Sequence, residues 1–180
     1  MSTRFVALLR GINVGGRNLI PMSDLAEAVR SGGYDDVSTY IQSGNVLFTA
    51  SAKPRDVESD LTRLIAERFS VQVPVVAQSA AEVAAVVGKA PAIFGSDDHR
   101  CDVIFLKHPL KAEEAMTAMP EPREGVDQIW PGPGVVYFAR LDAEASKSRL
   151  SRITAAPIYP NITIRNWNTT RKLHALLQQR

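Results

Sequence analysis

The stretch Phe5-Val6-Ala7-Leu8-Leu9-Arg10-Gly11-Ile12-Asn13-Val14-Gly15-Gly16-Arg17-Asn18 places an apolar run directly before a glycine-rich loop. The apolar residues at its start predict a buried strand. The glycines that follow can adopt positive φ, which lets backbone N–H groups point toward a ligand. Two arginines add positive charge to this loop, and two asparagines add amide groups. The loop therefore has the composition of an anion-binding segment, although it completes no catalytic motif.

The residues after this loop predict the rest of a first subdomain. The expected elements are a helix from Pro21 that ends at Gly32-Gly33, strands at 37–42 and 46–49, a helix at 57–68, a strand at 71–77 and a short helix around 83–87. Proline favours the first helical position and glycine favours a helix end. The turn Ser43-Gly44-Asn45 suits a hairpin between the two strands. The order is βαββαβ, followed by an extra helix.

The same order of elements returns after a polar stretch at Asp97–Cys101. The expected elements are a strand at 103–106, a helix at 112–119, strands at 126–130 and 135–139 around the turn Pro131–Gly134, a helix at 145–153, a strand at 162–165 and a final helix at 170–179. We therefore predict an α+β fold built by tandem duplication of two ferredoxin-like βαββαβ subdomains. The first is residues 1–95 with the extra helix, and the second is residues 96–180 with the C-terminal helix. Each half has a small core, so the two are expected to pack on one another.

The composition is that of an ordinary folded protein. Of the 180 residues, 45% are hydrophobic and 22% are charged, and the formal net charge is +2. This charge is far below the basic excess of a dedicated nucleic-acid-binding domain. The single cysteine excludes an internal disulfide framework and suits a reducing cytoplasm. The first apolar run is too short for a signal peptide or a membrane span, so we expect a cytoplasmic protein with no membrane partner.

Three segments, taken together, resemble one protein family. They are LLRGINVGG at residues 8–16, YIQSGNV at residues 40–46 and RNWNTTRKL at residues 165–173. The combination resembles the DUF1697 family of bacterial proteins over almost the whole chain. The resemblance implies a fold similar to two tandem ferredoxin-like subdomains. The name of the family marks a domain of unknown function, so the resemblance implies no activity.

The glycine-rich loop has two competing interpretations. Its spacing almost matches a P-loop, but Arg17 and Asn18 follow Gly16 where that motif has lysine and then serine or threonine. The lysine charge and the hydroxyl ligand for Mg²⁺ are therefore both missing, which argues against nucleotide hydrolysis. One interpretation is a glycine-rich connection whose polar groups satisfy the backbone. The other is an anion-binding loop.

The other two segments also have structural and functional interpretations. Ser43 lies in a hairpin turn without a nucleophile-elbow pattern, so a catalytic role is not expected, whereas Asn45 can reach the glycine-rich loop. Asn168 or Thr169 is a natural N-cap for the last helix. Trp167 is either an anchor between the halves or a stacking surface for a base or a sugar.

No cofactor or metal site is expected. Asp97, Asp98, His99 and Cys101 fit no zinc-binding spacing. The remaining histidines are isolated in the sequence. Cys101 begins a predicted strand and suits a small buried residue better than a nucleophile.

Three functions follow from these patterns. The favoured one is the binding of an anionic ligand, either a nucleotide or a nucleic acid. The alternatives are a cofactor-independent enzyme and a protein whose Asn and Gly residues only stabilise the fold. Because strand 46–49 should run antiparallel to the first strand, Arg10, Asn13 and Asn45 are expected to approach one another, with Arg165 or Lys172 nearby if the halves close. The candidate ligand-binding residues are Arg10, Asn13, Gly15, Gly16, Arg17, Asn18, Ser43, Asn45, Arg165, Trp167, Asn168 and Lys172.

Overall fold

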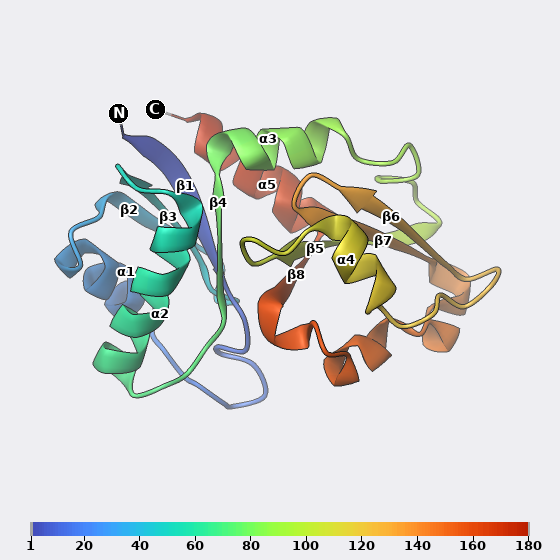
Figure 1. Cartoon of the computed structure of the whole chain (residues 1–180), viewed down its shortest axis with the longest axis horizontal. Helices are drawn as coiled ribbons and strands as arrows, with labels where there is room; N and C mark the ends of the chain where they lie inside the picture. Colours follow the sequence, from blue (N-terminus) through green and yellow to red (C-terminus); the bar gives the residue numbers. More distant parts are fainter. Residues whose placement is uncertain (1, 180) are drawn as a thin grey trace. The chain divides into compact units, whose positions relative to one another are not determined.

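The computed structural model describes residues 2–179. In chain order its elements are β1 (Thr3–Leu9), α1 (Met22–Ser31), β2 (Asp35–Tyr40), β3 (Asn45–Ala50), α2 (Pro54–Phe69), β4 (Val75–Ser79), α3 (Ala80–Gly88), β5 (His99–Leu106), α4 (Ala112–Thr117), β6 (Asp127–Gly132), β7 (Val135–Leu141), the 3₁₀ helices η1 (Asp142–Lys147), η2 (Leu150–Ala155) and η3 (Tyr159–Asn161), β8 (Ile162–Asn166) and α5 (Trp167–Gln178) (Figure 1).

The strands form two four-stranded sheets, in the orders β2-β3-β1-β4 and β6-β7-β5-β8. All pairs of neighbouring strands are antiparallel. Strands β1 and β5 occupy equivalent central places in the two orders, as the sequence predicted. The chain therefore has an α+β fold with two similar subdomains.

The chain divides into two compact units. The first contains the chain up to Ala81 and the segment from Leu173 onward, and the second is Glu82–Lys172. Most of helix α3, from Glu82 to Gly88, thus belongs to the same unit as the second sheet. One contact that joins α3 to this sheet is the hydrogen bond from the Tyr137 hydroxyl to the Val86 carbonyl oxygen, at 2.6 Å.

The core of the first unit lies between its sheet and helices α1 and α2. Alternate residues of β1, including Phe5 and Leu9, pack with Leu25 of α1 and Leu61 of α2. The apolar spacing along each helix produces this buried face. Pro54 occupies the first turn of α2, where its missing N–H costs nothing.

The core of the second unit lies on one face of its sheet. Ile104 and Phe138 pack there with Ala115 of α4 and Ile153 of η2. Among the described residues, no helix combines the length and the apolar character needed to cross a bilayer.

Two sequence predictions about elements were wrong. Strand β4 begins at Val75 rather than at residue 71. Its neighbour β1 ends at Leu9, opposite Val75, so residues 71–74 have no strand beside them with which to pair. The helix expected at 145–153 is replaced by 3₁₀ turns separated at Ser148, whose hydroxyl accepts the Leu150 N–H at 3.2 Å. Serine side chains that bond to the nearby backbone compete with an α-helix in this way.

Candidate functional site

The loop between β1 and α1 has a left-handed backbone at several positions. Positive φ occurs at Gly11, Asn13, Gly15, Gly16 and Asn18, with values between 46° and 77°. Val14 and Arg17 face one another across a tight turn, in which the Arg17 N–H donates to the Val14 carbonyl oxygen at 3.1 Å. Glycine at both central positions allows a turn of this hand. The loop therefore ends in a small, well-defined tip.

Asn13 and Asn18 hold this loop in place. The Asn13 amide nitrogen donates to the carbonyl oxygens of Ile20 at 2.9 Å and Gln42 at 3.0 Å, and its side-chain oxygen accepts the Ile20 N–H at 2.8 Å. Asn18 donates to the Gly11 carbonyl oxygen at 2.9 Å. These side-chain amides thus form hydrogen bonds with the backbone of the protein itself, as expected if the polar groups of the loop stabilise the fold.

The β2–β3 hairpin meets the loop, as the sequence predicted. Leu8 lies opposite Asn45 in the β1–β3 register, and the Leu9 N–H donates to the Gly44 carbonyl oxygen at 2.8 Å. The hydrogen bond from Asn13 to Gln42 also joins the two segments. A side chain at Gly44 would lie 2.9 Å from the Leu9 Cβ, so the close approach requires glycine.

Asn45 has a structural role in this hairpin. Its side chain is fully buried, and its amide nitrogen donates to the Tyr40 carbonyl oxygen at 2.9 Å and to the Ser43 hydroxyl at 3.3 Å. Ser43 is therefore one of the groups that orient Asn45. Both side chains were candidate ligand contacts, and these two hydrogen bonds of Asn45 lie inside the hairpin.

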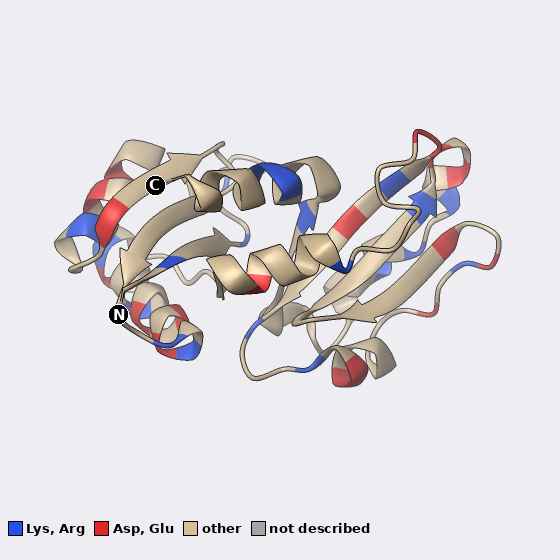
Figure 2. Ribbon diagram, turned by 90° about the horizontal axis from the view of Figure 1, so that it is seen from above, with Lys and Arg blue, Asp and Glu red and all other residues tan. Residues whose placement is uncertain are grey.

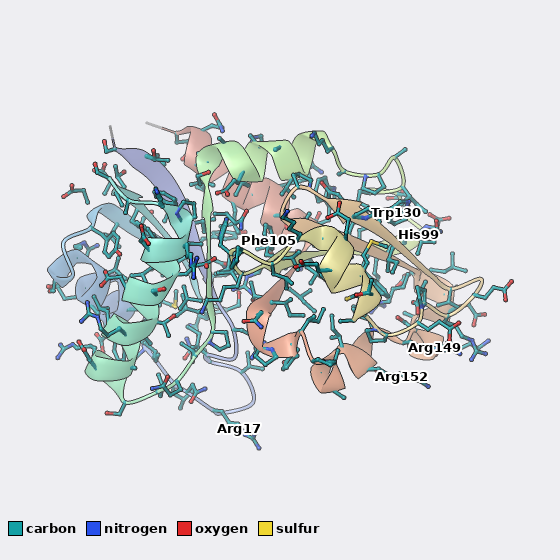
Figure 3. All side chains as sticks on the ribbon, in the orientation of Figure 1. Arg17, His99, Phe105, Trp130, Arg149 and Arg152 are labelled. Atoms are coloured by element: carbon teal, nitrogen blue, oxygen red, sulfur yellow. The ribbon has the colours of Figure 1, made fainter. Side chains whose placement is uncertain are left out.

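The groups that the loop exposes are at its tip. Gly15, Gly16 and Arg17 are exposed, and Figure 3 shows the Arg17 side chain at the outer end of the loop, pointing away from the ribbon. Within residues 2–179, no group accepts a hydrogen bond from the Gly15 or Gly16 N–H. No acidic residue occurs between Leu9 and Ser23. The tip therefore combines positive charge with accessible N–H donors.

The remaining candidates belong to the second unit. Arg165 is buried in β8, where its guanidinium donates to the Thr163 hydroxyl at 3.0 Å and the Ile164 carbonyl oxygen at 2.9 Å. Burial lowers the pKa of Arg165 to about 10. Lys172 is exposed on α5. Because these residues and the loop lie in different units, their approach to the loop stays a prediction.

The N-cap of α5 differs from the one predicted. Asn166 caps the helix, because its side-chain oxygen accepts the Thr169 N–H at 2.8 Å, and the helix begins at Trp167. Neither Asn168 nor Thr169 is the cap. Asn168 is instead an exposed residue of the first helical turn.

Trp167 and Asn168 line a cleft of about 560 Å³ in the second unit. The Trp167 ring packs edge-on against Phe94, with ring centroids 5.2 Å apart. Other lining residues were not predicted, among them Asp102 and Arg140, whose carboxylate and guanidinium lie 3.1 Å apart. Burial raises the pKa of Asp102. No sequence motif contains these residues, since they are far apart in the sequence. They come together only because distant strands pair.

The structure offers little support for nucleophilic catalysis in this cleft. Ser96 lies 3.4 Å and Asp98 2.8 Å from the same nitrogen, Nδ1, of His99. A Ser-His-Asp relay needs the two partners on opposite ring nitrogens. Burial also raises the pKa of the Cys101 thiol, which disfavours the thiolate. Among residues 2–179, no three His, Cys, Asp or Glu side chains are grouped as metal ligands would be.

Comparisons with known proteins identify a family of unknown function and a protein of similar structure. A family model described as "Protein of unknown function (DUF1697)" matches residues 2–137. The conserved bacterial protein SP0830 from Streptococcus pneumoniae has a similar structure, with a TM-score of 0.87 and 26% sequence identity over 99% of this chain and 100% of that chain. No curated protein matches the sequence.

Proposed function

We propose that this chain, which belongs to the family described as "Protein of unknown function (DUF1697)", binds the phosphate groups of an anionic ligand at the tip of the β1–α1 loop. The ligand is a nucleotide or a nucleic acid, which share this chemistry. The observation that carries the proposal is the exposed tip itself, where Arg17 follows two glycines whose N–H groups have no acceptor among the described residues.

The charge around this tip supports an anionic ligand. Elsewhere in the first unit acidic and basic residues are mixed on helices α1 and α2 (Figure 2), with ion pairs such as Arg63–Glu67 at 3.2 Å. The loop instead carries Arg10 and Arg17 and no carboxylate. A charge-assisted hydrogen bond to a phosphate oxygen contributes about 1.5–3 kcal/mol before desolvation.

The internal hydrogen bonds of the loop support the same function. Asn13 and Asn18 fix the backbone on either side of the tip. A loop that is already ordered loses less conformational entropy when it binds. The asparagines then act as positioning residues, whereas Gly15, Gly16 and Arg17 contact the ligand.

We also propose that the two subdomains are ferredoxin-like units related by duplication, in a cytoplasmic protein. The equivalent strand orders of the two sheets support the duplication. The single cysteine is in keeping with a reducing compartment.

The test compares Arg17→Ala with the unaltered full chain. The probes are inorganic phosphate, ATP and a fluorescein-labelled single-stranded oligonucleotide, and binding is followed by calorimetry for the first two and by fluorescence anisotropy for the third. Arg17→Ala is expected to weaken binding about tenfold. It should also reduce the slope of log K against log salt concentration by about one, as expected for the loss of one phosphate contact. A gain in affinity from phosphate to ATP favours a nucleotide, and a further gain with the oligonucleotide favours a nucleic acid.

Arg55→Ala is the matched control, because Arg55 is an exposed arginine of the same unit on α2. Arg10 is a poorer test, since it is half-buried and has contacts within the protein. Equal losses for Arg17→Ala and Arg55→Ala would mean only nonspecific attraction. No binding by any probe would leave the loop with the structural role that Asn13 and Asn18 indicate.

A further inference from the structure

Exposed apolar side chains are concentrated on one part of the first unit. Among residues 2–179, the large apolar side chains that are exposed are those of Val14 at 61%, Leu19 at 72% and Ile41 at 48%. All three lie on the β1–α1 loop or on the turn of the neighbouring β2–β3 hairpin. Single exposed apolar residues are common, but a group of them marks a surface that binds another molecule.

Leu19 and Ile41 line a pocket of about 450 Å³ in this unit. Ile20 and Met22 also line the pocket, and they belong to the apolar core of the unit or pack against it. Thr39 lies on the same face of the sheet as this core, because its partner in strand β3 is a core residue. The pocket is therefore an open end of the core, and its volume suits a small ligand.

Ile41 has an unfavourable backbone conformation in this pocket wall. Its φ is 49°, in the left-handed region that β-branched side chains disfavour. Asparagine or glycine would adopt the same conformation more easily. Backbone conformations of this kind persist at sites that hold ligands. An exposed isoleucine here thus points to contact with a ligand rather than to the stability of the hairpin.

Two polar side chains of the pocket are available to a ligand. Thr39 and Gln42 line the pocket, and within the described part of the chain neither side chain forms a hydrogen bond. The main chain of Gln42 is held by the amide nitrogen of Asn13, at 3.0 Å from the Gln42 carbonyl oxygen. The Gln42 carboxamide offers a donor and an acceptor side by side. Adenine presents the complementary pair, its amino group and N7.

The pocket adjoins the tip of the β1–α1 loop. Leu19 follows Arg17 by two residues, which is at most about 7 Å along the chain. The Asn13 N–H donates to the Asn18 carbonyl oxygen at 3.2 Å and so closes the loop between the tip and the pocket. The residues that line the pocket lie within positions 13–42 and carry no charge. A ligand can therefore place an anionic group at the tip and an uncharged ring in the pocket.

We propose that the ligand of this site is an adenine mononucleotide, with its phosphate at the loop tip and its base in the pocket. The base packs against Leu19 and Ile41, and the Gln42 carboxamide bonds to its amino group and N7. This assignment rests on the phosphate binding proposed above. A pocket of this volume takes one base, and the tip has one arginine, whereas a nucleic-acid backbone needs a row of cations.

The first test isolates the contribution of the base by calorimetry on the full-length protein. Adenosine 5′-monophosphate (AMP) is expected to bind about tenfold more tightly than ribose 5-phosphate, because it also buries an apolar ring. Ile41→Asn should reduce this ratio to about twofold and leave the protein folded, because asparagine accepts the left-handed backbone. Val14→Ser is the matched control, since Val14 is an exposed apolar residue that does not line the pocket, and it should leave the ratio unchanged.

The second test concerns the identity and the place of the base. Inosine 5′-monophosphate (IMP) has a keto group in place of the amino group, so it is expected to bind about fivefold more weakly than AMP. Gln42→Ala should remove this preference. In protein labelled with [methyl-¹³C]methionine, AMP is expected to shift the Met22 signal far more than ribose 5-phosphate does. The signals of Met116 and Met119, which lie in the second unit, should not move.

The possible outcomes separate this assignment from the phosphate site on which it rests. Equal binding of AMP and ribose 5-phosphate would overturn the base pocket and leave the phosphate site, whereas failure of both to bind would overturn the two together. Equal affinity for AMP and IMP, or a Met22 signal that AMP leaves unchanged, would also overturn the assignment. Self-association in sedimentation experiments that Ile41→Asn abolishes would instead assign the apolar residues to contact with a second copy of the chain.

Discussion

At the scale of single residues, Asn13 is the side chain on which the β1–α1 loop depends most. It has a positive φ of 53° and three hydrogen bonds to the main chain of Ile20 and Gln42. Asn13→Gly keeps the backbone conformation and removes these bonds. Each hydrogen bond contributes about 0.5–1.5 kcal/mol to stability, so Asn13→Gly is expected to lower the free energy of unfolding by about 2–4 kcal/mol.

Two further variants separate the causes of this loss in urea unfolding. Asn13→Ala should cost about 1 kcal/mol more than Asn13→Gly, because alanine disfavours a left-handed backbone. Asn18→Gly removes one exposed hydrogen bond and should cost about 1 kcal/mol or less. Equal losses at the two asparagines would contradict the role given to Asn13.

Tyr137 gives a prediction about pH. Its hydroxyl is buried and donates to the Val86 carbonyl oxygen, and burial raises the pKa of Tyr137 from 10.0 to about 12. The folded protein therefore retains this proton above the pH at which the unfolded chain loses it. The stabilisation is complete below pH 10 and is lost as the pH rises through about 12.

Absorbance titration of the native protein and of Tyr137→Phe tests this prediction. The difference between the two curves should show an ionisation near pH 12. At neutral pH the variant should unfold more easily by about 1 kcal/mol, through loss of the hydrogen bond to α3. An ionisation near pH 10 would show that the hydroxyl is accessible to solvent.

At the scale of elements, the strands were predicted best. Apolar runs such as Val135–Ala139 are bounded by turn residues, and this local pattern is sufficient to locate a strand. The segment at 145–153 was mistaken for an α-helix because its apolar spacing resembles one. Its backbone also depends on a contact from outside the segment, because the Asp127 carboxylate accepts the Arg149 N–H at 2.9 Å, in addition to the local hydrogen bond of Ser148.

The candidate site was predicted less completely than the fold. The meeting of the loop with the hairpin follows from strand order alone, so the contact between Asn13 and Gln42 was accessible from the sequence. The hydrogen bond from the Asn45 side chain to the Tyr40 carbonyl oxygen could not be predicted, because it depends on the conformation of the hairpin. The cleft beside Trp167 was not predicted, because strand pairing brings Asp102 and Arg140 to it from distant parts of the sequence.

Helix α2 protects the outer edge of the first sheet. Glu58 is fully buried, and its carboxylate accepts the Ala77 N–H of strand β4 at 3.0 Å. Strand β4 is at the end of its sheet, so this N–H has no strand partner on that side. Unpaired N–H groups on an outer strand can pair with a strand of another molecule and cause aggregation. The contact with Glu58 gives one of these groups an acceptor inside the protein.

Glu58→Ala is therefore expected to lower the free energy of unfolding by about 1–3 kcal/mol, because it leaves the Ala77 N–H unsatisfied. Glu58→Gln keeps an acceptor and should recover a large part of the loss. The control is Glu67→Ala, an exposed residue of the same helix. Urea unfolding that shows equal effects at positions 58 and 67 would contradict the protective role.

At the scale of the whole molecule, the two units combine a common strand order with different surfaces. The first exposes a positively charged loop tip, and the second contains a cleft with paired charges. Similar folds carry unrelated sites, because function depends on the residues placed on them. The proposed phosphate site therefore has to be tested by its location as well as by its affinity.

Titration of [¹⁵N]glycine-labelled full-length protein with inorganic phosphate measures that location. The chain has 11 glycines distributed over both units, so their amide signals report on the whole molecule in one experiment. The signals of Gly15 and Gly16 are expected to shift together and saturably, and Arg17→Ala should reduce both shifts. Saturable shifts at other glycines, such as Gly95 in the cleft, with Gly15 and Gly16 unchanged, would contradict phosphate binding at the loop tip.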